Sequence, residues 1–272
     1  MILTFKGLVK GVLPQMACEY SVRRSTYIRL GFNSSEATRK AFSSRRYQAM
    51  CDARINLLPR EITSALRTCV DAGAHLGSWT QALVGVFTPG QVIAVECEPQ
   101  LVEQLNKAFA SHPSVRVVDA ALGGSDGNAT FYQLRHPAGS SLLKPTAEIG
   151  KEFEAGSWDV IGETSVRKIT YDSLVAEESE ISVLKLDIQG AEKEVLTNSE
   201  EGLRKTKSII MEVLFTPHYD CDAGFAELHD LMRRKGFGLY RLSPSYDRGG
   251  RALFADAVYV REEILRALSP QP

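Results

Sequence analysis

The chain has 272 residues and a mass of 30.0 kDa, with 44% hydrophobic and 24% charged residues, so it can bury one sizeable core. This composition excludes a fibrous or largely disordered protein. The five cysteines contain no C-x-x-C pair, and their odd number cannot form a complete set of disulfides. We therefore expect a reducing, cytoplasmic compartment and no structural zinc.

The net charge of −1 is unevenly distributed along the chain. Residues 23–60 carry nine Arg or Lys against Glu36 and Asp52, which gives +7 there and −8 elsewhere. We predict a basic, mainly helical extension over 1–64 and a catalytic domain over 65–268. The extension is either a solvated arm packed on the acidic domain or a basic lid that meets an anionic partner. Nucleic acid is the less favoured partner, because aromatic residues do not alternate with the arginines.

The first residues give no sign of a signal peptide or a membrane span. Gly7, Gly11 and Pro14 interrupt the apolar residues before a long run builds up.

From residue 68 onward, short β-branched runs alternate with helical patterns, which is typical of a doubly wound parallel α/β sheet. Strands are predicted at 68–71, 92–96, 115–118, 129–134, 166–169, 183–187 and 208–214, with a C-terminal antiparallel hairpin at 237–242 and 256–260. Helices are predicted over 76–87, 99–109, from 190 onward, and over 225–234. The stretch 137–165 interrupts this pattern and is a candidate substrate lid.

A glycine turn follows the first predicted strand. Asp71 ends that strand, and Gly73 and Gly77 open the next helix, while Glu96 ends the second strand. A dinucleotide site would carry G-x-G-x-x-G and bind a pyrophosphate, which Asp71 would repel. S-adenosylmethionine has a sulfonium, an ammonium and a ribose diol but no phosphate, so acidic strand ends favour it. An ordinary turn of another α/β enzyme is the alternative.

Three residues further along are candidates for a catalytic base. Asp187 ends a strand at the edge where ligands of open α/β sheets bind. Glu212 follows Ile-Ile-Met, so its pKa should be raised, and His218 follows on a loop with a near-neutral intrinsic pKa. With His218, the two acids could instead hold a divalent metal, a less favoured alternative, and we predict no metal site.

Three blocks of sequence together resemble the FkbM family of S-adenosylmethionine-dependent methyltransferases. They are Val-Asp-Ala-Gly-Ala-His-Leu-Gly at 70–77, Val-Leu-Lys-Leu-Asp-Ile-Gln-Gly-Ala-Glu at 183–192 and Ile-Ile-Met-Glu-Val at 209–213. The resemblance covers about residues 65–245. It implies a Rossmann-like class I methyltransferase with a seven-stranded, mostly parallel sheet. It also implies O-methyl transfer to a hydroxyl of a sugar, glycan or secondary metabolite.

The resemblance also implies roles for individual residues. Cofactor contacts are expected from Asp71, Gly73, Ala74, His75, Gly77, Glu96, Asp119, Ala120 and Asp187. Ser140, Ser141 and Glu192 are expected on the acceptor side, although Ser140 and Ser141 could equally lie in a plain loop and Glu192 could simply start a helix.

The acceptor is expected to be a small molecule or a glycan, and a homodimer stays open. The rival classes are an RNA or protein methyltransferase that uses the basic arm, and a noncatalytic cofactor-binding relative. No Asn-Pro-Pro-Tyr-like clamp for base nitrogens follows Leu186, which disfavours the RNA alternative.

Overall fold

The computed structural model describes residues 54–220 and 222–268, so most of the predicted basic extension lies outside the described residues. Among the described residues, no helix is both long and apolar enough to cross a membrane. The helices are η1 (Ile55–Leu57), α4 (Arg60–Thr63), α5 (Ser78–Val86), α6 (Pro99–Ala108), η2 (Pro137–Gly139), α7 (Ile149–Glu152), α8 (Tyr171–Leu174), α9 (Glu192–Thr197), α10 (Glu201–Lys205), α11 (Phe225–Arg234) and α12 (Glu262–Leu268). The strands are β1 (Thr68–Ala72), β2 (Gln91–Glu96), β3 (Val115–Asp119), β4 (Ala121–Leu122), β5 (Gly127–Leu134), β6 (Val160–Ile169), β7 (Ile181–Leu186), β8 (Thr206–Leu214), β9 (Phe237–Leu242), β10 (Tyr246–Arg248) and β11 (Arg251–Arg261).

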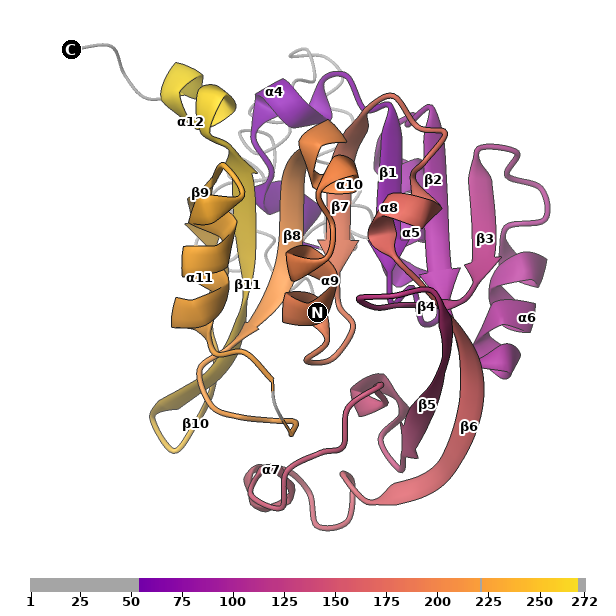
Figure 1. Cartoon of the computed structure of the whole chain (residues 1–272), viewed down its shortest axis with the longest axis vertical. Helices are drawn as coiled ribbons and strands as arrows, with labels where there is room; N and C mark the ends of the chain where they lie inside the picture. The colour runs from indigo at the N-terminus through magenta and orange to yellow at the C-terminus, as the bar shows by residue number, and fades with distance from the viewer. Residues whose placement is uncertain (1–53, 221, 269–272) are drawn as a thin grey trace, which may run out of the picture.

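The main sheet has the order β10-β11-β8-β7-β1-β2-β3, and β9 also pairs with β11 (Figure 1). Strands β3, β2, β1, β7 and β8 are parallel, and β11 is antiparallel to β8 and β9, as the predicted α/β fold and hairpin require.

The sheet has eight strands rather than the predicted seven. Strands β9 and β10 pair with successive parts of β11 and so share one edge position. Pro244 lies between them, and a proline has no backbone N–H for the ladder.

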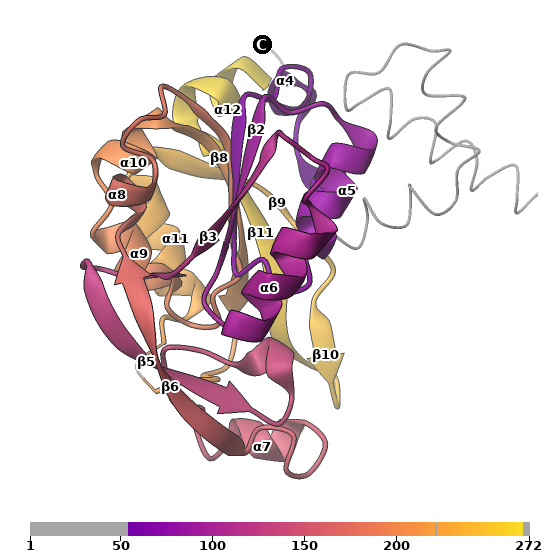
Figure 2. The same ribbon diagram turned by 90° about the vertical axis from the view of Figure 1, so that its right-hand side faces the viewer.

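Helices cover both faces of the main sheet. Figure 2 shows α5 and α6 on one face and α8 to α11 on the other. All five residues of β1 are buried, which explains why its sequence reads as a continuous run rather than an alternation. The two faces form separate clusters of buried side chains, the larger of them on the α8 to α11 side.

A second sheet of order β4-β6-β5 projects past the carboxyl ends of β1 and β2 (Figure 1). Strand β6 begins at Val160, six residues before the strand predicted over 166–169, because it pairs with β5 along its whole length. Many of these extra residues are exposed, so hydrophobic periodicity did not reveal them. The predicted lid over 137–165 therefore ends in strand, and its first part contains η2 and α7.

The segment just before β1 is part of the main core. Ile55, Leu58 and Ile62 are fully buried in the same cluster as Trp79 and Leu83 of α5. The predicted boundary between 64 and 65 therefore falls inside one packed core.

We expect Ile62→Ala to lower the free energy of unfolding by about 2–5 kcal/mol, the usual cost of truncating a buried aliphatic side chain. Ser64→Ala, an exposed position two residues away, is the matched control. Urea unfolding followed by circular dichroism measures both. Equal stability of the two variants would show that residues 55–63 do not belong to this core.

Candidate active site

The turn after β1 brings two parts of the chain into close contact. Gly73 has φ +72°, and a Cβ built on it would lie 1.9 Å from the backbone carbonyl oxygen of Asp187. Only glycine therefore allows the turn after β1 to touch the chain that leaves β7. A glycine is required at Gly77, at φ +77°, for a different reason. A Cβ there would lie 2.7 and 2.8 Å from side-chain atoms of Phe109 and Leu105, so the glycine allows α5 to pack on α6.

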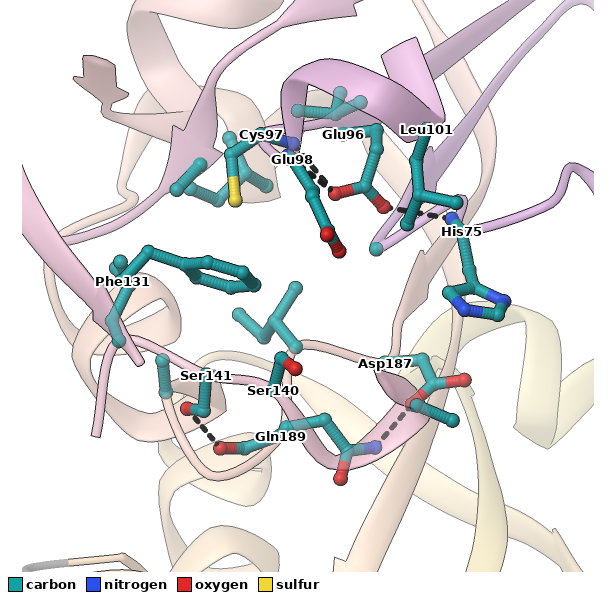
Figure 3. A pocket seen from close by; sticks show the side chains of 18 of the residues that line it. His75, Glu96, Cys97, Glu98, Leu101, Phe131, Ser140, Ser141, Asp187 and Gln189 are labelled. Atoms are coloured by element: carbon teal, nitrogen blue, oxygen red, sulfur yellow. Dashed lines mark hydrogen bonds between the residues drawn. The ribbon is translucent and has the colours of Figure 1, made fainter. Parts of the chain in front are cut away.

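Glu96 is a carboxylate fixed by backbone groups. Its Oε2 accepts a hydrogen bond from the His75 N–H at 2.8 Å, and its Oε1 accepts from the N–H groups of Cys97 and Glu98 at 2.7 and 2.9 Å (Figure 3). The two oxygens of a carboxylate have about four lone-pair sites, so with three of them occupied Glu96 keeps one, on Oε2, to accept from a ligand hydroxyl.

Asp71 is fully buried and faces another side chain rather than a hollow. Its Oδ2 accepts from Thr80 Oγ1 at 2.7 Å, and its Oδ1 lies 3.1 Å from Lys185 Nζ. Asp71 therefore contacts Lys185 and lines neither of the two hollows described below, so its predicted contact with the cofactor stays a prediction.

Lys185 joins the ends of β1 and β7. Its ammonium lies 3.4 Å from Asp187 Oδ2 and donates to the Gly73 carbonyl at 3.1 Å, besides its contact with Asp71. Burial disfavours the charged ammonium, but the carboxylates of Asp71 and Asp187 outweigh this effect and raise the pKa of Lys185. The site prediction omitted Lys185. The available signal was a lysine within the apolar run of β7.

A first hollow opens between the ends of β1, β2 and β7 and the second sheet (Figure 3). The predicted residues that line it are Gly73, His75, Glu96, Ala120, Ser140, Ser141 and Asp187. Lining residues that the prediction missed include Cys97, Glu98, Leu101, Phe131, Leu142 and Gln189. Asp119 is exposed at the end of β3 and is not among the lining residues.

The two predicted serines line this hollow, and their hydroxyls also form hydrogen bonds with backbone groups around it. Ser140 Oγ accepts from the Leu134 N–H at 3.0 Å, and Ser141 Oγ donates to the Gln189 carbonyl at 2.6 Å.

A second hollow shares Gly73, His75 and Asp187 with the first. Ala74 and Glu212 line this second hollow. No described residue donates a hydrogen bond to the Glu212 carboxylate. Burial, and then the nearby carboxylates of Asp187, Glu192 and Asp256, raise the pKa of Glu212 well above its ordinary value, as the sequence predicted.

His218 and Glu192 lie outside both hollows. His218 is buried between the rings of Phe153, Trp158, Tyr219 and Phe254, and burial lowers its pKa to about 4. Glu192 is buried at the start of α9, where its Oε1 accepts from the Ile188 N–H at 3.1 Å. Burial raises the pKa of Glu192 to about 7.

Of the three base candidates, the structure therefore brings together Asp187 and Glu212 but not His218. A position on a loop did not reveal the aromatic residues that enclose the histidine. Within residues 54–220 and 222–268, no three His, Cys, Asp or Glu side chains gather as metal ligands would.

A family model described as the methyltransferase FkbM domain matches residues 71–239, more than half of the chain. The chain belongs to the FkbM methyltransferase family. The predicted family is thereby confirmed, and the protein is an S-adenosylmethionine-dependent methyltransferase. No curated protein matches the sequence.

The similarity to solved structures is weak. The methyltransferase FkbM from Methylobacillus flagellatus is 12% identical with a TM-score of 0.42, over 93% of this chain and 60% of that one. Fibrillarin from Aeropyrum pernix, solved with S-adenosylmethionine, is 10% identical with a TM-score of 0.42, over 72% of this chain and 66% of that one. EvdMO1 is 12% identical with a TM-score of 0.44, over 79% and 41%. These likenesses identify no acceptor.

We expect Gly73→Ala to weaken S-adenosylmethionine binding at least about tenfold, or 1.4 kcal/mol, because the new Cβ displaces the turn from Asp187. Gly150→Ala on α7 is the matched control, since its Cβ would meet nothing within 4 Å and it lines neither hollow. Isothermal titration calorimetry measures both affinities, and circular dichroism verifies folding. Unchanged affinity in a folded Gly73→Ala variant would remove this turn from the cofactor site.

Proposed function

We propose that this methyltransferase transfers the methyl group of S-adenosylmethionine to a hydroxyl of a sugar, glycan or secondary metabolite. The observation that carries the proposal is the meeting of the two hollows at Gly73, His75 and Asp187, with Glu212 lining the second. A methyl donor in the first hollow and an acceptor in the second would meet beside these two carboxylates.

The residues of the first hollow fit the chemistry of this donor. Glu96 can accept a hydrogen bond from a ribose hydroxyl, since three backbone N–H groups leave one lone-pair site on its Oε2. Leu101, Phe131 and Leu142 offer apolar surface to an adenine ring. The turn at Gly73 and the Asp187 carboxylate remain for the methionine end, where a negative charge attracts the sulfonium.

The bound donor supplies a methyl carbon that an oxygen attacks in line, so that the C–S bond breaks and its electron pair stays on sulfur. Glu212 takes the proton that the acceptor hydroxyl loses. Its raised pKa suits this task, because a base works best when its pKa lies near the working pH. Asp187 accepts a hydrogen bond from the hydroxyl, and the Lys185 ammonium, 3.4 Å from Asp187 Oδ2, holds the carboxylate in place.

Transfer of tritium from methyl-labelled S-adenosylmethionine tests the acceptor class. The panel contains monosaccharides, oligosaccharides and hydroxylated metabolites, with total RNA and mixed protein as alternatives. We expect label on a hydroxyl compound. Label only in RNA or protein would contradict the proposal and favour the rival classes.

Once an acceptor is identified, its turnover rate can be measured against pH. The rate should rise with pH through the raised pKa of Glu212, because only the deprotonated carboxylate can take the proton. Glu212→Gln should lower kcat by about 10²–10⁴-fold, the usual contribution of a general base, and should abolish this rising limb. Glu103→Gln, exposed on α6, is the control. If Glu212→Gln keeps the wild-type kcat and the same rise of turnover rate with pH, Glu212 is excluded as the base.

A further inference from the structure

Three segments that are distant in the sequence meet at Gln189. Ser141 of the predicted lid donates from its Oγ to the Gln189 carbonyl at 2.6 Å, and the Tyr219 hydroxyl lies 2.7 Å from Gln189 Oε1. On its other side, Gln189 Nε2 donates to Asp187 Oδ1 at 2.7 Å (Figure 3). One carboxamide thus contacts the loop after β8 and the reacting end of the site.

Tyr219 connects this carboxamide to the lid. Its hydroxyl is buried and also lies 2.8 Å from the Gly139 carbonyl. Burial and the nearby carboxylates of Glu212, Glu192 and Asp187 raise the pKa of Tyr219 well above its ordinary value, so the hydroxyl stays protonated and can only share its proton between these two oxygens.

The backbone on each side of Tyr219 is paired with the lid. The Thr146 N–H donates to the His218 carbonyl at 2.9 Å, and the Asp220 N–H donates to the Lys144 carbonyl at 2.8 Å. A shift of the lid therefore moves the loop that holds Tyr219.

The turn at Gln189 is fitted closely to these neighbours. Gln189 has φ +56°, a left-handed conformation that a non-glycine residue adopts only where its surroundings hold it. The next residue, Gly190, has φ +97°, and its Cβ would lie 2.9 Å from the Tyr219 ring and 3.2 Å from Leu143 of the lid. The lid, the turn and the loop therefore pack as one unit.

The contact with Asp187 has a chemical consequence. An N–H donor on Oδ1 and the Lys185 ammonium near Oδ2 contact both oxygens of Asp187 and fix the orientation of its carboxylate. No residue in the described part of the chain donates to Glu212, which faces Asp187, Glu192, Asp256 and Lys185, with Asp256 paired to Arg54. Asp187 is thus fixed in place to orient the acceptor hydroxyl, while Glu212 takes its proton.

Building on the function proposed above, we propose that Gln189 is a positioning residue that couples the packing of the lid to the orientation of the Asp187 carboxylate, with Tyr219 as the connecting donor. Methyl transfer then takes place only when residues 137–146 are packed against Gln189 and Tyr219. A ligand that displaces residues 137–146 therefore disturbs the orientation of the Asp187 carboxylate and stops methyl transfer.

Hydrogen exchange of the peptide 137–146, without donor or acceptor, tests the coupling independently of the reaction. We expect exchange about tenfold faster in Tyr219→Phe and Gln189→Met. Tyr171→Phe is the matched control, since its buried hydroxyl contacts Thr206 at 2.8 Å and no lid residue. Because coupling is reciprocal, Asp187→Ala must also accelerate exchange in the lid. Lid exchange unchanged in Asp187→Ala and Tyr219→Phe would overturn the proposal.

Kinetics give the second readout. Tyr219→Phe should lower kcat about tenfold, while Tyr171→Phe keeps its kcat. A Tyr219→Phe variant as active as Tyr171→Phe would also overturn the coupling. If the lid coupling holds but the label appears only in RNA or protein, the proposed function is wrong and the coupling stands.

Discussion

The buried ammonium of Lys185 is the interaction on which the site depends. It lies between Asp71 and Asp187 and donates to the Gly73 carbonyl, so a single charge fixes the turn after β1 against the end of β7. Two carboxylates and one ammonium leave a net negative charge at this edge of the sheet. That charge favours a cationic methyl donor over a phosphate-bearing cofactor.

The two sheets supply different side chains to the site. The parallel strands of the main sheet deliver Glu96, Asp187 and Glu212 at their carboxyl ends, as the topology of open α/β sheets dictates. The second sheet and the lid provide Phe131 and Ser141, which close the first hollow. Gln189 lies where the two parts meet, which explains why its carboxamide and carbonyl contact both.

Much of the scaffold was predictable because its signals are local. The glycine turn, the acidic strand ends and the raised pKa of Glu212 follow from short runs of sequence and from the apolar residues around them. The family match over 71–239 agrees with the resemblance carried by the same blocks.

The errors and omissions share a physical cause, which is contact between distant segments. The aromatic cluster around His218 combines residues from the lid, the loop after β8 and β11, so the loop position alone suggested a base. The sequence shows that Asp71 is acidic, but it does not show that Asp71 pairs with Lys185, which lies 114 residues further along the chain. Phe131, Tyr219 and the early start of β6 likewise depend on pairings that no local pattern records.

A double-mutant cycle of Asp71→Asn and Lys185→Met, read as the free energy of unfolding, tests this central constraint most directly. Each single variant leaves an uncompensated buried charge or an orphaned partner, which usually costs about 3–5 kcal/mol. The account predicts that the double variant loses at least about 1 kcal/mol less than the sum of the single losses. Strictly additive losses would contradict it, because they would show that the two side chains act independently.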